Sequence, residues 1–227
     1  MLQRFLKRKV EVAKKEEEKN GNDNAGAPKP NLKDIPFFLP KDMLKRAHDL
    51  FFHSEGIQYL SKEQNQVFVG GSYKQVPRKQ AAYSPVLGMT YSFSGTTVEA
   101  RDEAEVPLLK ELRLYVEEKT GVAFNFVFIN YYETGQNTIG WHSDDEKDMV
   151  AGATIGSLTF GTSRDFDFRL KKDSSVKHRV QLHDNHLLLM LHPTNRDWHH
   201  SLPRRARVNQ PRVNLTFRQF KTQASLF

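Results

Sequence analysis

The chain has 227 residues, of which 38% are hydrophobic and 27% are charged, and its formal net charge is +7. It contains no cysteine, which excludes disulfides, thiolate metal sites and a cysteine nucleophile, so any metal must bind His, Asp or Glu side chains. No apolar stretch approaches the ~18 residues of a membrane-spanning helix, and the N-terminus lacks the apolar core of a secretion signal, so we expect neither a membrane protein nor a secreted one.

In chain order, residues 1–34 are expected to form a flexible basic arm, because the stretch 20–30 supplies no core-forming side chains. The folded domain is expected over residues 35–227. Apolar residues at helical spacing predict helices at 42–53 and 106–119, the second ending before Gly121. Short strands are predicted at 67–69, 90–93, 124–129, 154–160, 165–170, 178–182, 187–191 and 213–217. This succession predicts one α+β domain, a jelly-roll core with flanking helices.

The positive charge is concentrated near the C-terminus. Residues 193–221 contain six arginines and one lysine against a single acid, Asp197. A clustered basic surface attracts phosphates, which makes nucleic acid the candidate partner class. A solvated basic face without a partner explains the charge equally well.

The triplet His142-Ser143-Asp144 is the first pattern that indicates chemistry. In an extended segment, residues two apart project to the same side, so an imidazole and a carboxylate can occupy adjacent positions of one metal ion. Two histidines and one carboxylate on one face of iron(II) leave three positions open for a co-substrate and O₂. An exposed polar turn is the alternative. Spacing alone does not choose the second histidine among His178, His183, His186, His192, His199 and His200.

The second pattern is the alternation in residues 212–218. On a strand, Arg212, Asn214, Thr216 and Arg218 share one side, and the apolar residues between them share the other. Two guanidinium groups on one side suit a dicarboxylate, because each can hold a carboxylate through two hydrogen bonds. An ordinary half-exposed strand explains the same alternation.

Together these patterns resemble the AlkB family of iron(II)- and 2-oxoglutarate-dependent dioxygenases, which repair alkylated nucleic acid. The matching motifs are NYYETG from Asn130, HSDD from His142, WHHSLP from Trp198 and RVNLTFR from Arg212. The resemblance runs from about Val76, through VPRKQAAY and TYSFSG, to Arg218. It implies a double-stranded β-helix, in agreement with the predicted strands, with a nucleotide-recognition segment at about 67–97.

The resemblance also implies roles for individual residues. The iron(II) ligands would be His142, Asp144 and His200, because the family's second metal histidine precedes Ser-Leu-Pro. The 2-oxoglutarate pocket would be lined by Asn130, Tyr132, Arg212, Asn214, Thr216 and Arg218, with Arg218 pairing with the distal carboxylate. Tyr91 and Phe93 would form the base pocket, with Phe93 stacking on the base, and Asp145 would accept a hydrogen bond from its exocyclic amine. The phosphate contacts would be Arg78, Arg204, Arg205 and Arg207.

The implied reaction is oxidative demethylation of N-alkylated bases in DNA. It would consume 2-oxoglutarate and O₂, form succinate and CO₂, and release the hydroxylated methyl group as formaldehyde. The expected lesions are 1-methyladenine and 3-methylcytosine, since both are cationic and pair poorly, which lowers the cost of flipping the base. Two alternatives stay open: an AlkB-like enzyme acting on RNA or protein, and a jelly roll that binds nucleic acid without catalysis.

One departure from the family concerns duplex DNA. The family's duplex-binding relative fills the gap of the flipped base with an aromatic residue, and ungapped alignment places Gly70 at that position. Phe68 lies two residues away, but a register shift of one residue would point it elsewhere. We therefore expect either a preference for single strands or another way of flipping the base out of a duplex. The arm partly resembles a sliding-clamp-binding motif, with Lys7 where an aliphatic residue is expected. We expect a monomer, nuclear in a eukaryote and otherwise cytoplasmic.

Overall fold

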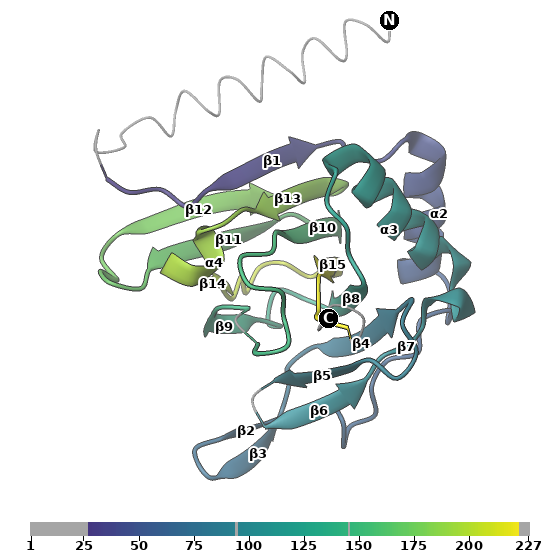
Figure 1. Cartoon of the computed structure of the whole chain (residues 1–227), viewed down its shortest axis with the longest axis horizontal. Coiled ribbons are helices and arrows are strands. Elements are labelled where there is room, and N and C mark those ends of the chain that lie inside the picture. The colour runs from purple at the N-terminus through teal and green to yellow at the C-terminus, as the bar shows by residue number, and fades with distance from the viewer. Residues whose placement is uncertain (1–26, 94, 145, 223–227) are drawn as a thin grey trace, which may run out of the picture.

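The computed structural model describes residues 27–93, 95–144 and 146–222. Two sheets and two hairpins make up its β-structure (Figure 1). The larger sheet contains, in spatial order, β1 (Leu32–Pro36), β13 (His186–Met190), β10 (Ile155–Gly161), β15 (Arg212–Arg218), β8 (Phe126–Tyr132), β4 (Lys79–Ser84) and β7 (Arg101–Asp102). The smaller sheet contains β12 (Lys177–Leu182), β11 (Arg164–Leu170), β14 (Trp198–Leu202) and β9 (Ile139–His142). The hairpins are β2 (Gln66–Val69) with β3 (Ser72–Gln75), and β5 (Thr90–Phe93) with β6 (Thr96–Glu99).

Two helices cover the outer face of the larger sheet, as Figure 1 shows. They are α2 (Lys41–Phe52) and α3 (Pro107–Thr120), while a short 3-10 turn (Glu103–Glu105) precedes α3 and the one-turn α4 (Thr194–Asp197) precedes β14. The helix α3 ends, as predicted, where Gly121 adopts a left-handed φ of 71°. None of the helices in the described ranges is long and apolar enough to cross a membrane.

In strand β15, the apolar and polar residues that alternate along the sequence face opposite sides of the sheet. Val213, Leu215 and Phe217 face the helices and join the apolar core beneath α2 and α3. The polar residues of the strand face the smaller sheet instead, and every residue from Arg212 to Arg218 is buried. The strand is therefore not half-exposed: one of its faces builds the core and the other builds a polar interior. The double-stranded β-helix with flanking helices is the fold that the sequence predicted.

The boundary of the arm was predicted too late in the chain. Residues 32–34 were assigned to the arm, but they belong to β1, which pairs antiparallel with β13. None of the five side chains of β1 is fully buried, so its sequence has no apolar run that would reveal a strand. Main-chain hydrogen bonds and the contact between Asp34 and buried His186 attach it to the sheet. Residues 1–26, which include Lys7 and the segment compared with a clamp-binding motif, lie outside the described residues, so clamp binding stays a prediction.

Candidate metal and co-substrate site

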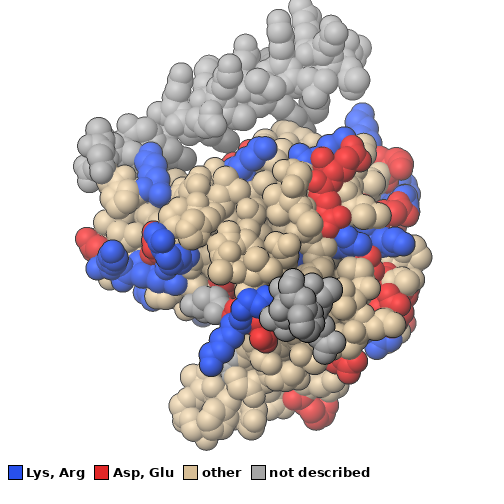
Figure 2. Space-filling model, in the orientation of Figure 1, with Lys and Arg blue, Asp and Glu red and all other residues tan. Residues whose placement is uncertain are grey.

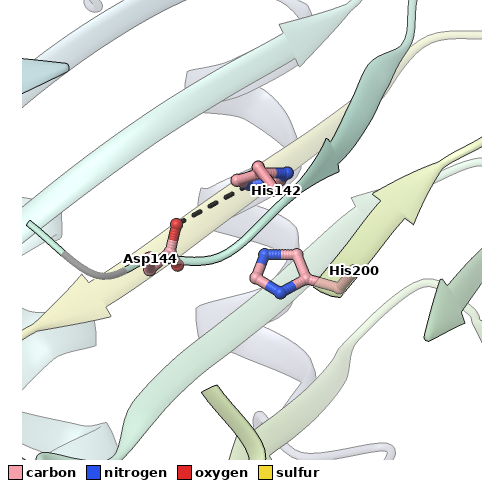
Figure 3. A group of neighbouring side chains, drawn as sticks. All are labelled: His142, Asp144 and His200. Carbon is pink, nitrogen blue, oxygen red and sulfur yellow. Dashed lines mark ion pairs between the residues drawn. The ribbon is translucent and has the colours of Figure 1, made fainter. Parts of the chain in front are cut away.

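Three side chains with metal-binding atoms meet between the sheets. His142 is the last residue of β9, Asp144 follows two residues later, and His200 lies on β14 directly opposite His142 in the strand pairing. Their ligand atoms lie within 4.8 Å of one another, and Figure 3 shows the carboxylate and both imidazoles around one space. Strand pairing thus brings His200, of the six candidate histidines, next to the His142-Ser143-Asp144 triplet. His199 projects from the other side of β14.

The protonation states of these groups suit a divalent metal. Burial, together with the neighbouring His142, lowers the pKa of His200 to about 3, so its imidazole is neutral. The Nδ1 atom of His142 lies 2.9 Å from the carbonyl oxygen of Gly140, a contact that requires a proton on Nδ1 and leaves Nε2 for a metal. Burial alone would raise the pKa of Asp144, but the charge and the hydrogen bond of Arg218 outweigh it and hold this pKa below its usual value. Two imidazoles and one carboxylate are a donor set that fits iron(II).

The segment that carries Asp144 is held by α4. The backbone N–H of Asp144 donates to Oδ1 of Asn195 at 2.9 Å, and the Asn195 amide donates back to the carbonyl of Asp144. The hydroxyl of Ser143 donates to the carbonyl of Trp198 at 3.3 Å. These contacts attach the turn that carries Asp144 to α4 and to the first residue of β14.

Arg218 is paired with the metal-binding carboxylate. Its Nη2 donates to Oδ1 of Asp144 at 2.8 Å, and its Nη1 lies 3.8 Å from Oε1 of Glu146. Burial opposes the positive charge, yet Asp144 and the other neighbours raise the pKa of Arg218 above its usual value. These contacts differ from the expectation that Arg218 pairs with the distal carboxylate of 2-oxoglutarate, because its charge is already neutralised beside the metal position.

Arg212, unlike Arg218, has no anionic partner among the described residues. It is fully buried, and its hydrogen bonds go to neutral groups, the hydroxyl of Thr159 at 2.9 Å and Oδ1 of Asn214 at 2.8 Å. It lies over the ring of Tyr132, and its Nε has no partner among the described residues. Burial lowers the pKa of Arg212 to about 10. A buried cation without a counter-ion is costly, so this arrangement calls for an anionic ligand.

The amide of Asn130 is oriented by two donors. Arg78 Nε at 2.7 Å and Gln80 Nε2 at 2.9 Å both donate to its Oδ1. The NH₂ group of Asn130 therefore points away from them and is available as a donor. Arg78 also donates to the carbonyl of Thr138 at 3.0 Å. Arg78 lines the pocket through these contacts, and the phosphate contact predicted for it from the sequence stays a prediction.

A cavity of about 710 Å³ joins these groups to the surface. Tyr91 and Phe93 line it as a stacked pair with ring centres 4.9 Å apart. The hydroxyl of Tyr91 donates to Oε1 of Glu146 at 2.6 Å, and burial raises the pKa of both groups. The other carboxylate oxygen of Glu146 is buried and has no hydrogen-bond partner in the described part of the chain. Asp145, predicted to contact the substrate, lies outside the described residues.

The hairpin beside this cavity ends in two glycines. Gly70 and Gly71 have φ angles of 61° and 81°, as a two-residue turn between antiparallel strands requires. Val67 and Val69 line the cavity. Phe68 points to the opposite side of β2, where it packs edge-to-face against Tyr73 of β3 with ring centres 5.1 Å apart. No side chain at the tip can therefore act as an aromatic finger, and Phe68 does not replace it inside the cavity.

The three arginines of the predicted basic cluster, Arg204, Arg205 and Arg207, differ in their contacts. Arg205 is ion-paired with Asp165, and Arg204 donates to the side chain of Gln136. Arg207 is exposed, and no ion pair involves it in the described ranges. Of the three arginines, Arg207 is therefore the one whose positive charge is most available to a phosphate group.

The loop that contains Arg204, Arg205 and Arg207 is joined by backbone hydrogen bonds to the loop that follows β8. The backbone N–H of Gly135 donates to the carbonyl of Val208 at 2.7 Å, and that of Arg205 donates to the carbonyl of Gly135 at 2.8 Å. The buried Arg164 donates to backbone carbonyls of both loops, those of Asn137 and Pro203.

This close approach requires glycine at position 135. A Cβ there would lie 1.9 Å from the carbonyl oxygen of Arg205, so Gly135→Ala must displace backbone. We expect a loss of about 1–3 kcal/mol of unfolding free energy, and a melting temperature lower by about 2–4 °C for each kcal/mol. Thermal unfolding of Gly140→Ala is the control, because a Cβ on Gly140 meets nothing within 4 Å. Equal melting temperatures for Gly135→Ala and Gly140→Ala would contradict the close approach of the two loops at Gly135.

Several residues that line the pocket or lie beside it were not predicted from the sequence. Gln80, Ser157, Thr159 and Glu146 all make the hydrogen bonds or ion pairs that orient the predicted residues. Ser157 and Thr159 lie on β10, next to β15, so the alternation of β10 was a usable signal. The position of Glu146, two residues after Asp144, was a second usable signal in the sequence.

Comparison with known proteins places the chain among oxygenases. Residues 35–218 match the sequence model of the family described as the 2OG-Fe(II) oxygenase superfamily. Among curated proteins, the DNA oxidative demethylase ALKBH2 of Bos taurus is 46% identical over 171 residues, which cover 72% of this chain and 60% of that protein. ALKBH2 of Homo sapiens is 44% identical, covering 72% of this chain and 64% of the relative.

More distant relatives agree. The human alpha-ketoglutarate-dependent dioxygenase alkB homolog 3 is 36% identical over 152 residues, covering 63% of this chain and 52% of that protein. The solved structure of OsALKBH1 shares the fold, with a TM-score of 0.52 and 18% identity over 85% of this chain and 99% of that one. The chain spans 60% of the length of the Bos taurus ALKBH2 and 64% of the length of the Homo sapiens ALKBH2.

Proposed function

The chain belongs to the 2OG-Fe(II) oxygenase superfamily, and on this premise we propose that it is an oxidative demethylase of alkylated bases in DNA. Its cofactor would be iron(II), held by His142, Asp144 and His200, with 2-oxoglutarate and O₂ as co-substrates. The bound iron and 2-oxoglutarate supply the oxidising chemistry, and the protein supplies binding, orientation and exclusion of water. The proposal for DNA follows the activity named in the ALKBH2 relatives.

The observation that carries this proposal is Arg212, a buried guanidinium without an anion in the same cavity as the three metal-binding side chains. A dicarboxylate that reached the metal with one end would place its distal carboxylate on Arg212. We therefore assign the distal carboxylate to Arg212, and assign Arg218 to holding Asp144 ionised and oriented. Tyr132, Asn214 and the NH₂ group of Asn130 would complete the 2-oxoglutarate pocket. The hydroxyl oxygen of Thr216 accepts a hydrogen bond from the Asn214 amide at 3.1 Å and so orients that amide.

The outer part of the cavity suits a flipped cationic base. The stacked Tyr91 and Phe93 offer an aromatic wall, and a methylated base with a positive charge is attracted to such a ring face. The unpartnered oxygen of Glu146 is an acceptor for an exocyclic amine, in the role that the sequence analysis gave to Asp145. The two lesions expected from the sequence, 1-methyladenine and 3-methylcytosine, carry both features, a positive charge and an exocyclic nitrogen.

The direct test is formaldehyde release from oligonucleotides with 1-methyladenine or 3-methylcytosine, in the presence of iron(II) and 2-oxoglutarate. DNA and RNA versions, single- and double-stranded, are compared at equal concentration. Release that requires 2-oxoglutarate and is fastest on DNA supports the proposal. Succinate formed without any release of formaldehyde would reject these lesions, and absence of both products would reject the oxygenase activity itself. The ratio between single and double strands tests the preference for single strands that the glycine tip of the β2–β3 hairpin predicts.

Salt dependence provides a separate prediction for the basic cluster. Each phosphate contact made by an arginine adds about one unit to the slope of log affinity against log salt concentration. We expect Arg207→Ala to reduce this slope by about one, and Arg205→Ala to change it less because Asp165 already neutralises Arg205. The measurement is fluorescence anisotropy of a labelled oligonucleotide at several salt concentrations. A larger change for Arg205→Ala than for Arg207→Ala would contradict the assignment.

A further inference from the structure

An exposed tryptophan stands at the mouth of the cavity. Trp141 precedes His142 in β9, lines the cavity and keeps 37% of its surface exposed. The guanidinium carbon of Arg169, from β11, lies 4.6 Å from the centre of its ring. The arginine packs against the indole, and more than a third of the Trp141 side chain stays open to solvent beside the cavity. The aromatic surface of Trp141 beside the cavity has no role in the proposed demethylation.

The surface beside Trp141 is basic. In the strand pairing, Arg169 lies opposite Lys177 of β12 and His199 of β14, so these side chains form a row across the smaller sheet toward β9. Arg179 on the same face is ion-paired with Asp167, but Arg169 has no ion pair with any residue the structure describes. Figure 2 shows Lys and Arg side chains gathered at the left of the view, over the ends of β11 and β12. The lobe with the β2–β3 hairpin, at the bottom of the same view, shows almost none.

We propose that Trp141 is a stacking platform for a nucleobase adjacent to the one that occupies the cavity, and that Arg169 and Lys177 contact the phosphates of the same strand. This inference rests on the proposed action on nucleic acid. Every base has a ring face, so stacking on an indole holds a strand without selecting its sequence. The positive row beside the indole supplies the charge that a phosphate backbone requires. The partner is thus a single strand that passes over β9 and β11 with one base turned into the cavity.

Intrinsic fluorescence tests the platform without relying on activity. The chain has two tryptophans, and the other one, Trp198, is only 3% exposed. An unmodified single-stranded oligonucleotide is titrated into the wild type and into Trp141→Phe, while anisotropy of a labelled copy records binding. We expect a saturable fluorescence change in the wild type that is mostly absent from Trp141→Phe, although that variant still binds. An equal change in both proteins would overturn the proposal.

Kinetics with the methylated oligonucleotide supply the second test. We expect Trp141→Ala to raise KM for the oligonucleotide about tenfold, with a smaller effect on kcat, and Trp141→Phe to recover most of the affinity. Arg169→Ala is expected to raise KM less and to lower the salt slope by about one. The control is Leu114→Ala, which shortens a side chain on α3 that is 46% exposed.

The outcomes separate this inference from the proposed function. If the wild type demethylates the oligonucleotide but Trp141→Ala behaves like Leu114→Ala, the platform is rejected and the demethylase stands. If the wild type neither binds nor demethylates the oligonucleotide, both are rejected.

Discussion

The Asp144→Asn variant is expected to release formaldehyde more than about 100-fold more slowly than the wild type. An amide has the shape of the carboxylate but not its charge, so the candidate iron site loses its one anionic ligand. Loss of an outer partner of a metal ligand already costs roughly 10–100-fold in metal affinity or activity, and loss of a ligand should cost more.

The same substitution is also expected to destabilise the metal-free protein. It leaves the guanidinium of Arg218 buried without its partner at 2.8 Å, and breaking such a buried pair costs about 3–5 kcal/mol. Glu146, 3.8 Å from Arg218, should hold the loss toward the lower end of this range. The double variant Asp144→Asn/Arg218→Met removes the uncompensated charge, so it should recover much of the stability and none of the activity.

Thermal unfolding, iron binding and formaldehyde release of the same preparations separate the two effects. Asp42→Asn, which changes an exposed carboxylate on α2, is the matched control. Activity of Asp144→Asn within about tenfold of the wild type would show that Asp144 is not a metal ligand.

The Arg212→Met variant is expected to raise KM for 2-oxoglutarate about 100-fold. Removal of one member of a buried, hydrogen-bonded charge pair costs about 2–5 kcal/mol, and 100-fold lies within that range. Met fills a similar volume, and the cation it replaces has no anion in the protein without co-substrate, so stability in the absence of 2-oxoglutarate should stay the same or rise. The stabilisation that 2-oxoglutarate gives to the wild type should be largely lost.

The measurement is thermal unfolding with and without 2-oxoglutarate, together with initial rates over a range of its concentration. Arg46→Met, at an exposed arginine paired with Glu111, is the control for the loss of a guanidinium. Arg212→Lys should recover only part of the affinity, because an ammonium group does not hold a carboxylate through two parallel hydrogen bonds. A normal KM in Arg212→Met with a raised KM in Arg218→Met would return the distal carboxylate to Arg218.

Local patterns were sufficient for most of the secondary structure. The helices α2 and α3 and the strands β10, β11, β13 and β15 follow from apolar periodicity, which depends only on neighbours in the chain. The strands β1, β4, β9 and β14 were missed because their sequences are polar or mixed. They are strands because paired neighbours satisfy their backbone groups, and the identity of a neighbour strand is not a local property.

The sequence by itself determined which chemistry the site carries: an imidazole and a carboxylate two residues apart, and two arginines on one face of a strand. The resemblance of its motifs extended this to the family and to His200. Only the tertiary structure decided how the charges are divided. Arg212 and Arg218 are equivalent in the sequence pattern, and they differ because the turn after β9 brings Asp144 to Arg218 and leaves Arg212 among neutral groups. Electrostatic interaction depends on distance in space, and that distance is set by how the two sheets are paired and packed.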